Sequence, residues 1–336
     1  MKTTIRSVTI SKFILSAVII LVVSPLYSQT CCTGGIPIAG NITFENSSTG
    51  NWQVGVISGF NLLHTLKEED HILKDDSRKR NVYSLLFRSG YSITENLVAG
   101  AVVPFIRRER WITHAEATNF SYAQGLGDII LTTQYRLPFS NFHHTFRIGV
   151  GSKMATGRSD IKNPQGLTYN MDMQPGSGSF DWFFQGAYDR LFRKTPTLNF
   201  SLRVFYRLNG KNNDYLGSQT HQFGNEWQIL TGLSKQWLIL SEVFNTSLLL
   251  KLRNMKKNRI NDFPVPNTGG IWLRLIPSVS YQPTQQTKMS LVPEIPVYSK
   301  LNGTQLTTSF SIQLSFSTSL GQSAPMDHSG MNKSMP

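Results

Sequence analysis

The stretch SFSIQLSFSTSLG, residues 309–321, alternates between two kinds of side chain. Its even positions are apolar except for Thr318, whereas its odd positions from 309 to 319 carry serine and glutamine. A period of two residues predicts a β-strand, because successive side chains point to opposite faces of the pleat. This strand has one face suited to an apolar medium and one face of hydroxyl and amide groups.

The same alternation returns along the chain in about twelve segments. They lie near residues 51–66, 80–94, 96–113, 126–137, 142–156, 178–192, 196–209, 222–235, 237–253, 268–282, 286–299 and 305–320. Each is about as long as a tilted strand needs to cross the hydrocarbon core of a bilayer, roughly 9 to 11 residues.

The connections between these segments alternate in length. Long ones lie near 67–79, 114–125, 156–177, 210–221 and 254–267, and tight ones near 94–96, 138–141, 193–195, 236 and 283–285. Only the last hairpin, 300–304, is short where a long connection is due. Short turns at one end and long loops at the other are typical of bacterial outer-membrane barrels.

Two other β architectures explain this pattern less well. A soluble sandwich has no reason to sort its loops by length, and an open sheet of this size would expose edge strands, whereas closure satisfies the backbone in lipid. We therefore predict an all-β transmembrane antiparallel β-barrel of about 12 strands over residues 51–321. The apolar face of each strand would meet lipid and the serine face would meet the lumen.

The start of the chain predicts export. Lys2, Arg6 and Lys12 precede an apolar stretch from 13 to 23, and the small Ser28 follows, which is typical of a signal peptide over residues 1–28. No later segment approaches the roughly 18 consecutive apolar residues of a membrane helix. Residues 29–50 would form a periplasmic N-terminal segment, in which Cys31 is a weak candidate for lipidation.

The charge is basic but dispersed. Without the three cations of the signal peptide, the formal net charge of +13 becomes +10. A soluble secreted protein with a basic surface is an alternative at this stage. Lysine and arginine are spread singly along the strands instead of gathering in a patch, which argues against nucleic-acid binding.

Strand alternation places a set of charged side chains in the lumen. The cations are Arg88, Arg136, Arg147, Lys153, Arg203, Arg207 and Arg274, and the nearby acids are Asp128, Asp181 and Glu226. Charges inside a barrel must pair or contact water. They would form either a buried ion-pair network that closes the barrel or a hydrated basic passage that favours anionic or amphipathic solutes.

Three further features of the sequence bear on function. The sequence GLGD at 125–128 is glycine-rich but precedes a strand with no following helix, which argues against a phosphate-binding loop. The longest loop, 156–177, could fold inward as a constriction. Residues 322–336 form a polar tail, in which the methionines are either incidental or ligands for a soft metal such as Cu(I). The candidate ligands are Met326, His328, Met331 and Met335.

Some twelve-stranded outer-membrane barrels are lipases, which need a serine activated by histidine. None of the histidines of the mature chain lies at a spacing that singles out a partner serine. We therefore predict that the protein is not an enzyme and has no cofactor.

Four segments carry a resemblance to a known family. QGLGDIILTTQYRL (124–137), QPGSGSFDWFFQGAYDRLF (174–192), FGNEWQILTGLSKQ (223–236) and NGTQLTTSFSIQLSFS (302–317) resemble the phenol meta-pathway transporter family of outer-membrane proteins. That family is similar to the long-chain fatty-acid transporter class. The sequences TCCTGGIPIAGN and DDSRKR resemble versions from Bacteroidetes-type bacteria.

The resemblance implies an outer-membrane channel or transporter for the passive passage of small hydrophobic or amphipathic solutes. It also implies that residues 29–50 could enter the barrel as a plug. Both termini would be periplasmic and the long loops extracellular, with outer-membrane lipid, small-molecule solutes and the barrel-assembly machinery as partners. The alternative is a metal-responsive or structural barrel whose tail binds copper.

Overall fold

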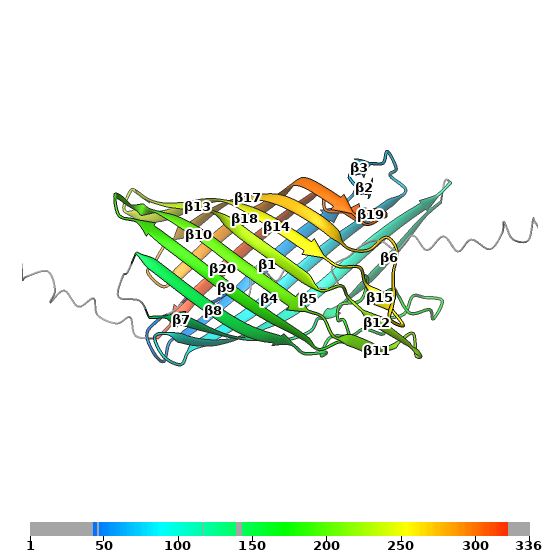
Figure 1. Cartoon of the computed structure of the whole chain (residues 1–336), viewed down its shortest axis with the longest axis horizontal. Helices are drawn as coiled ribbons and strands as arrows, with labels where there is room; N and C mark the ends of the chain where they lie inside the picture. Colours follow the sequence, from blue (N-terminus) through cyan, green and yellow to red (C-terminus); the bar gives the residue numbers. More distant parts are fainter. Residues whose placement is uncertain (1–42, 46, 116, 139–142, 322–336) are drawn as a thin grey trace, which may run out of the picture.

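The computed structural model describes residues 43–45, 47–115, 117–138 and 143–321, which form a closed antiparallel β-barrel (Figure 1). Twelve long strands make the wall, and the pairing of β1 with β20 closes the ring. The predicted fold class is confirmed. The strands are β1 (Trp52–Leu63), β4 (Arg78–Ser92), β5 (Leu97–His114), β7 (Ile130–Leu137), β8 (His144–Lys153), β9 (Asp181–Phe192), β10 (Thr195–Leu208), β13 (Glu226–Ile239), β14 (Glu242–Met255), β17 (Gly270–Gln282), β18 (Thr287–Leu301) and β20 (Phe310–Leu320).

The two ends of the barrel differ, as the loop lengths predict. One end, called the turn end here, carries the tight turns at 93–96, 193–194, 240–241 and 283–286. The other, called the loop end, carries short strands within the long connections (Figure 1). β2 (Thr65–Glu68), β3 (His71–Ile72) and β19 (Thr304–Thr307) form one small sheet there, and β11 (Lys211–Tyr215), β12 (Gln219–Gln222), β15 (Arg259–Ile260) and β16 (Phe263–Pro264) form a second.

Two predicted connections are wrong. The segment 114–125 is not a loop, because β6 (Ala117–Leu126) pairs back onto β5 as a hairpin at the loop end. The turn predicted at Gln236 lies instead at 240–241, since β13 continues to Ile239, which pairs with Glu242. In both places the added residues pair with only one neighbouring strand, β6 with β5 and residues 236–239 of β13 with β14, and the alternation of apolar and polar residues no longer marks where the strand ends.

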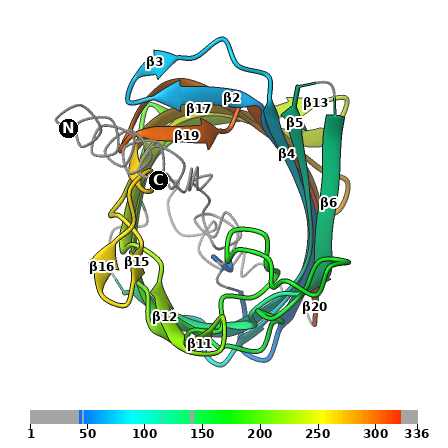
Figure 2. The ribbon, with the colours of Figure 1, turned by 90° about the vertical axis from the view of Figure 1, so that its right-hand side faces the viewer.

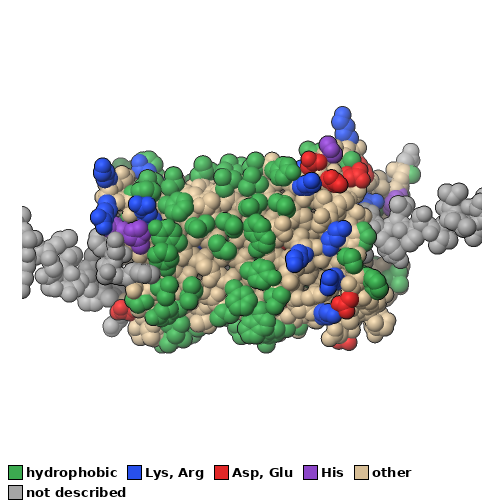
Figure 3. Space-filling model, in the orientation of Figure 1, with side chains coloured by type: hydrophobic (Ala, Val, Ile, Leu, Met, Phe, Trp, Pro, Cys, Tyr) green, Lys and Arg blue, Asp and Glu red, His purple; other side chains and the backbone are tan. Residues whose placement is uncertain are grey.

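Side chains of the wall alternate between the outside and the lumen. In β20, Leu314 is 58% exposed on the outside, whereas its neighbour Gln313 is 8% exposed inside. Figure 3 shows apolar side chains in a band around the middle of the barrel, with the charged side chains on this face near its two ends. A contiguous apolar band of this kind is typical of a surface that faces lipid. Within the described ranges, no helix is long and apolar enough to cross a membrane.

Candidate functional site

Phe44 lies inside the barrel although it precedes the first strand. Its ring sits over Gly90 of β4 and Gly100 of β5, which are paired across the sheet. A Cβ atom at these glycines would lie 2.4 and 2.2 Å from the ring, so the ring fits only because both residues lack a side chain. The guanidinium carbon of Arg88 lies 4.5 Å from the ring centroid. Arg88 also donates a hydrogen bond to the carbonyl oxygen of Thr43.

Phe44 belongs to an apolar cluster on the lumen side. Phe44 itself is only 2% exposed, and the ring centroids of Phe183 and Phe205 in this cluster lie 5.8 Å apart. The interior therefore contains apolar as well as charged groups. The other members are Ile57, Leu86, Val98, Val102, Ile130, Phe183 and Phe205, from β1, β4, β5, β7, β9 and β10.

Glu45 ties the same segment to two more strands. Its Oε1 lies 3.0 Å from Nζ of Lys288 in β18. The backbone N–H of Glu45 donates to Oε1 of Gln53 in β1 over 3.1 Å, and Nε2 of Gln53 donates back to the carbonyl oxygen of Glu45. The ammonium of Lys288 lowers the pKa of the Glu45 carboxyl, so this ion pair persists at neutral pH.

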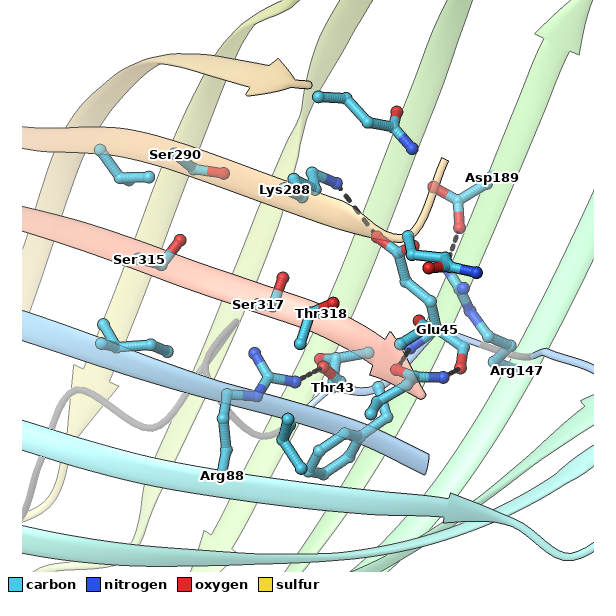
Figure 4. Close-up of a pocket in the computed structure, with 18 of the residues that line it drawn as sticks. Thr43, Glu45, Arg88, Arg147, Asp189, Lys288, Ser290, Ser315, Ser317 and Thr318 are labelled. Atoms are coloured by element: carbon cyan, nitrogen blue, oxygen red, sulfur yellow. Dashed lines mark hydrogen bonds and ion pairs between the residues drawn. The ribbon is translucent and has the colours of Figure 1, made fainter. Parts of the chain in front are cut away.

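A polar cavity of about 660 Å³ extends from this segment toward the turn end (Figure 4). The hydroxyl face of the sequence SFSIQLSFSTSLG supplies part of its lining, through Ser315, Ser317 and Ser319. Five cationic side chains line it against two carboxylates, Glu45 and Asp189, so its lining is net positive. The cations are Arg88, Arg136, Arg147, Arg203 and Lys288.

Among the described residues, two of these cations have a carboxylate partner. Arg147 pairs with Asp189, and Lys288 pairs with Glu45. In the described part of the chain, Arg88, Arg136 and Arg203 form no ion pair, although Nε of Arg136 donates to Oδ1 of Asn96 over 3.0 Å. Unneutralised cations in a polar cavity can be satisfied by water or by an anion.

Toward the loop end the lumen charges are buried and paired. Nζ of Lys153 lies 2.7 Å from Oδ2 of Asp128 and 3.1 Å from Oδ2 of Asp181. A second group joins three strands, since Glu294 pairs with Lys251 at 3.0 Å and with Arg274 at 2.9 Å. Because each of these side chains is at most 10% exposed, removing one member would leave an uncompensated buried charge.

A third buried pair completes this layer. Arg253 of β14 contacts Oε2 of Glu226 of β13 at 2.5 Å, and Nε2 of Gln228 donates to the same carboxylate. Arg207 is 2% exposed and adds its positive charge beside Glu226. Paired charges therefore lie toward the loop end, and a cavity with a net positive lining lies toward the turn end.

The longest loop folds into the mouth of the barrel, where it is seen inside the ring of strands (Figure 2). Asp172 in this loop pairs with Arg80 of β4, and Arg108 of β5 donates to the Asp172 carbonyl oxygen over 2.6 Å. Burial would raise the pKa of the Asp172 carboxyl, but the surrounding guanidinium groups, Arg80 first, lower it overall. The loop is thus held in the mouth by charge.

Apolar contacts hold this loop as well. Met171 packs with Tyr215 and Phe223 from the neighbouring connection. His221 of β12 lies edge-on to Phe223, with ring centroids 4.6 Å apart, and burial lowers the pKa of His221 to about 4. His221 is therefore neutral at pH 7. Its ring packs with Tyr215 and Phe223, which hold Met171 of the long loop, and we call that loop the cap.

The ten predicted lumen residues all lie on the inner side of the wall, in two groups. Four of them line the cavity, namely Arg88, Arg136, Arg147 and Arg203. The other six are buried toward the loop end, namely Asp128, Lys153, Asp181, Arg207, Glu226 and Arg274. The tail residues Met326, His328, Met331 and Met335, and Cys31, lie outside the described residues.

Several residues of the lumen were not predicted. Lys251 and Arg253 alternate with Leu250 and Leu252 in β14, so the same period-two argument could have found them. Arg108 was hidden, because residues 107–110 carry charges on both faces of β5. The other missed residues are Glu45, Arg80, Asp172, Asp189, Lys288 and Glu294. Only Glu45 and Asp172 lie outside the strands of the wall, so for these two alone the link to the lumen needed the tertiary structure.

No protein-family model matches the chain, and no curated protein matches its sequence. The structure is similar to the crystal structure of an outer membrane channel from Pseudomonas putida F1, with a TM-score of 0.65 and 13% sequence identity. That match covers 83% of this chain and 99% of the other. The chain has the fold of outer-membrane β-barrels.

More distant barrels also match. They include the NanC porin, with a TM-score of 0.44, 12% identity and coverage of 80% of this chain and 100% of the porin. A FadL homologue from Pseudomonas aeruginosa matches with a TM-score of 0.40, 7% identity and coverage of 80% and 90%. Membership of the phenol meta-pathway family stays a prediction.

Proposed function

We propose that the protein is an outer-membrane channel for the passive passage of small anionic solutes, including amphipathic ones. The observation that carries this proposal is the lumen cavity, where five cations face two carboxylates. Cations that line a narrow passage raise the local concentration of anions and repel cations. The adjoining apolar cluster could contact the apolar part of an amphipathic anion, which is why the proposal includes such solutes. Purely hydrophobic solutes fit the polar lining of the cavity less well.

In this proposal the segment around Phe44 is a plug and the long loop is a cap. Phe44 completes an apolar cluster, and apolar constrictions in channels gate by dewetting. The paired charges at the loop end fill the rest of the mouth. Passage of a solute would then require the plug or the cap to move, which makes low conductance with brief openings the expected behaviour.

The barrel would lie in the outer membrane with its tight turns in the periplasm and its long loops outside, as in other barrels of this type. Its apolar band would contact lipid, and the barrel-assembly machinery would insert it. This role requires neither a catalytic group nor a cofactor.

Reversal potentials of refolded protein in planar bilayers under a KCl gradient test the proposal. We expect a preference for chloride, and we expect it to fall when Arg136 and Arg203 are both replaced by alanine. The same charge change at two exposed turn-end cations, Arg193 and Lys194, is the matched control and should leave selectivity unchanged. The measurement is repeated with Phe44→Ala, so that a closed plug does not hide the result. A channel without anion preference in both backgrounds contradicts the proposal.

A further inference from the structure

A second cavity lies at the loop end, outside the lumen. It has a volume of about 670 Å³ and lies between the two small loop-end sheets. Asn254, Ile271 and Lys300 line it, and they are paired neighbours across β14, β17 and β18. Their sequence neighbours Met255, Trp272 and Leu301 are buried together in a cluster, so these three face outward by strand alternation. We call this cavity the loop-end groove.

The loop-end groove is basic. Lys256, Lys257 and Lys300 line it and are exposed, and Glu69 is the one carboxylate among the described lining residues. Across the described residues, none of the three lysines forms an ion pair, whereas five other lysines do. Figure 3 shows Lys and Arg side chains on the loop-end part of this face, next to the apolar band. The lysines are therefore available to an external anion.

The backbone under these lysines is fixed. The N–H of Lys256 donates to the carbonyl oxygen of Asn225 over 2.9 Å, and the N–H of Asn302 donates to that of Gly269 over 3.1 Å. Gly269 has a φ of +77°, and a Cβ atom there would lie 2.6 Å from the carbonyl oxygen of Met255. The backbone beside the groove is thus tightly packed, because neither Gly269 nor the lining residue Gly270 has room for a side chain.

The height of the groove along the wall indicates its ligand. Ile271 is 39% exposed at its edge, and two residues below Lys300 the wall exposes Tyr298 in the apolar band. Lysines just beyond a lipid-facing band, beside an interfacial tyrosine, occupy the level of lipid headgroups. Basic clusters at that level attract anionic lipids. A free solute would gain little from the adjoining apolar wall.

We propose that the loop-end groove binds the phosphate groups of a phosphorylated lipid in the leaflet that faces the loop end. The three ammonium groups would contact the phosphates, and acyl chains would lie along the apolar wall below Ile271. This inference rests on the membrane placement given under Proposed function, but not on the passage of solutes, because the groove lies outside the lumen.

The test compares two triple variants of the full-length refolded protein in an uncharged detergent. The first is Lys256→Gln, Lys257→Gln and Lys300→Gln. The matched control is Arg190→Gln, Arg193→Gln and Lys194→Gln, which removes the same charge from a groove at the turn end. Native mass spectrometry would measure the binding of diphosphorylated lipid A, dephosphorylated lipid A and inorganic phosphate, and heat-modifiability on gels would verify folding.

We expect the first variant to lose at least tenfold in affinity for diphosphorylated lipid A, because each lysine near a membrane surface strengthens the binding of anionic lipids. The control variant and wild type should bind it alike, and both should bind the dephosphorylated lipid weakly. Equal losses in both variants, no loss in the first, or displacement of the lipid by millimolar inorganic phosphate would overturn the proposal. Chloride selectivity of the first variant is recorded too and should not change, so failure of the lipid site and failure of the channel are told apart.

Discussion

Replacing Phe44 with alanine should open the channel. The ring is almost fully buried, and complete burial of such a side chain contributes about 1.5–3 kcal/mol relative to exposure. Losing about 2 kcal/mol raises the ratio of released to docked plug roughly thirtyfold, since 1.4 kcal/mol is a factor of ten. The contacts of Glu45 remain, so the segment should be loosened while the wall stays folded. Single-channel recording should show a higher open probability than in wild type.

The same plug can be displaced from the wall side. Gly100→Ala places a methyl group 2.2 Å from the Phe44 ring and should open the channel without changing Phe44 itself. Gly186→Ala is the matched control, because a Cβ atom there has no neighbour within 4 Å. The reasoning is refuted if Phe44→Ala and Gly100→Ala both fold and leave the recordings at the wild-type level, or if Gly186→Ala has the same effect as they do.

Three further predictions test the wall, the cap and the orientation. Leu314→Arg should destabilise the folded barrel by about 2–4 kcal/mol and impair assembly, because it puts a charge on the lipid face. Gln313→Arg places its charge in the cavity and should be tolerated. Equal heat-modifiability of the two variants would contradict the assigned faces. The cap should loosen as pH falls from about 6.5 to 4, because a released His221 takes up a proton over that window whereas the buried ring, with a pKa of about 4, stays neutral. Release is favoured by an amount on the order of 3 kcal/mol once the pH is below both pKa values. Protease cleavage of the cap should rise over this range in wild type but not in His221→Phe. An epitope inserted at Asp75 should be reachable by antibody on intact cells, and labelling of one at Gln285 without permeabilisation would reverse the proposed orientation.

The inner and outer faces were predictable because they depend on a local rule. In a strand, the direction of each side chain follows from whether its position is odd or even. Arg203 and Arg207 were therefore assigned to the lumen from LNFSLRVFYRL alone, and both lie there. The missed hairpin at 114–126 shows where the rule stops. That hairpin projects beyond the rest of the wall, so little of it is buried and its sequence does not alternate clearly.

The grouping of the charges was not predictable in the same way. Glu294 pairs with Lys251 and Arg274, yet it lies 43 residues from the first and 20 from the second. Which inward side chains meet depends on the tilt and register of the strands, since these decide the height that each residue reaches along the lumen. The space that the Phe44 ring occupies also depends on strand register, because Gly90 and Gly100 become neighbours only through the pairing of β4 with β5.

By itself the sequence determined the class of fold, the two faces of its strands and the sorting of loops by length. These features are properties of short segments, which period-two alternation and turn composition encode directly. Tertiary structure alone decided where charges neutralise one another, where they stay unpaired beside the cavity, what lies against Phe44, and that two lysines after β14 and one in β18 line one groove. Each of these depends on contacts between segments distant in the chain, and closing the barrel fixes all of those contacts at once through a single register.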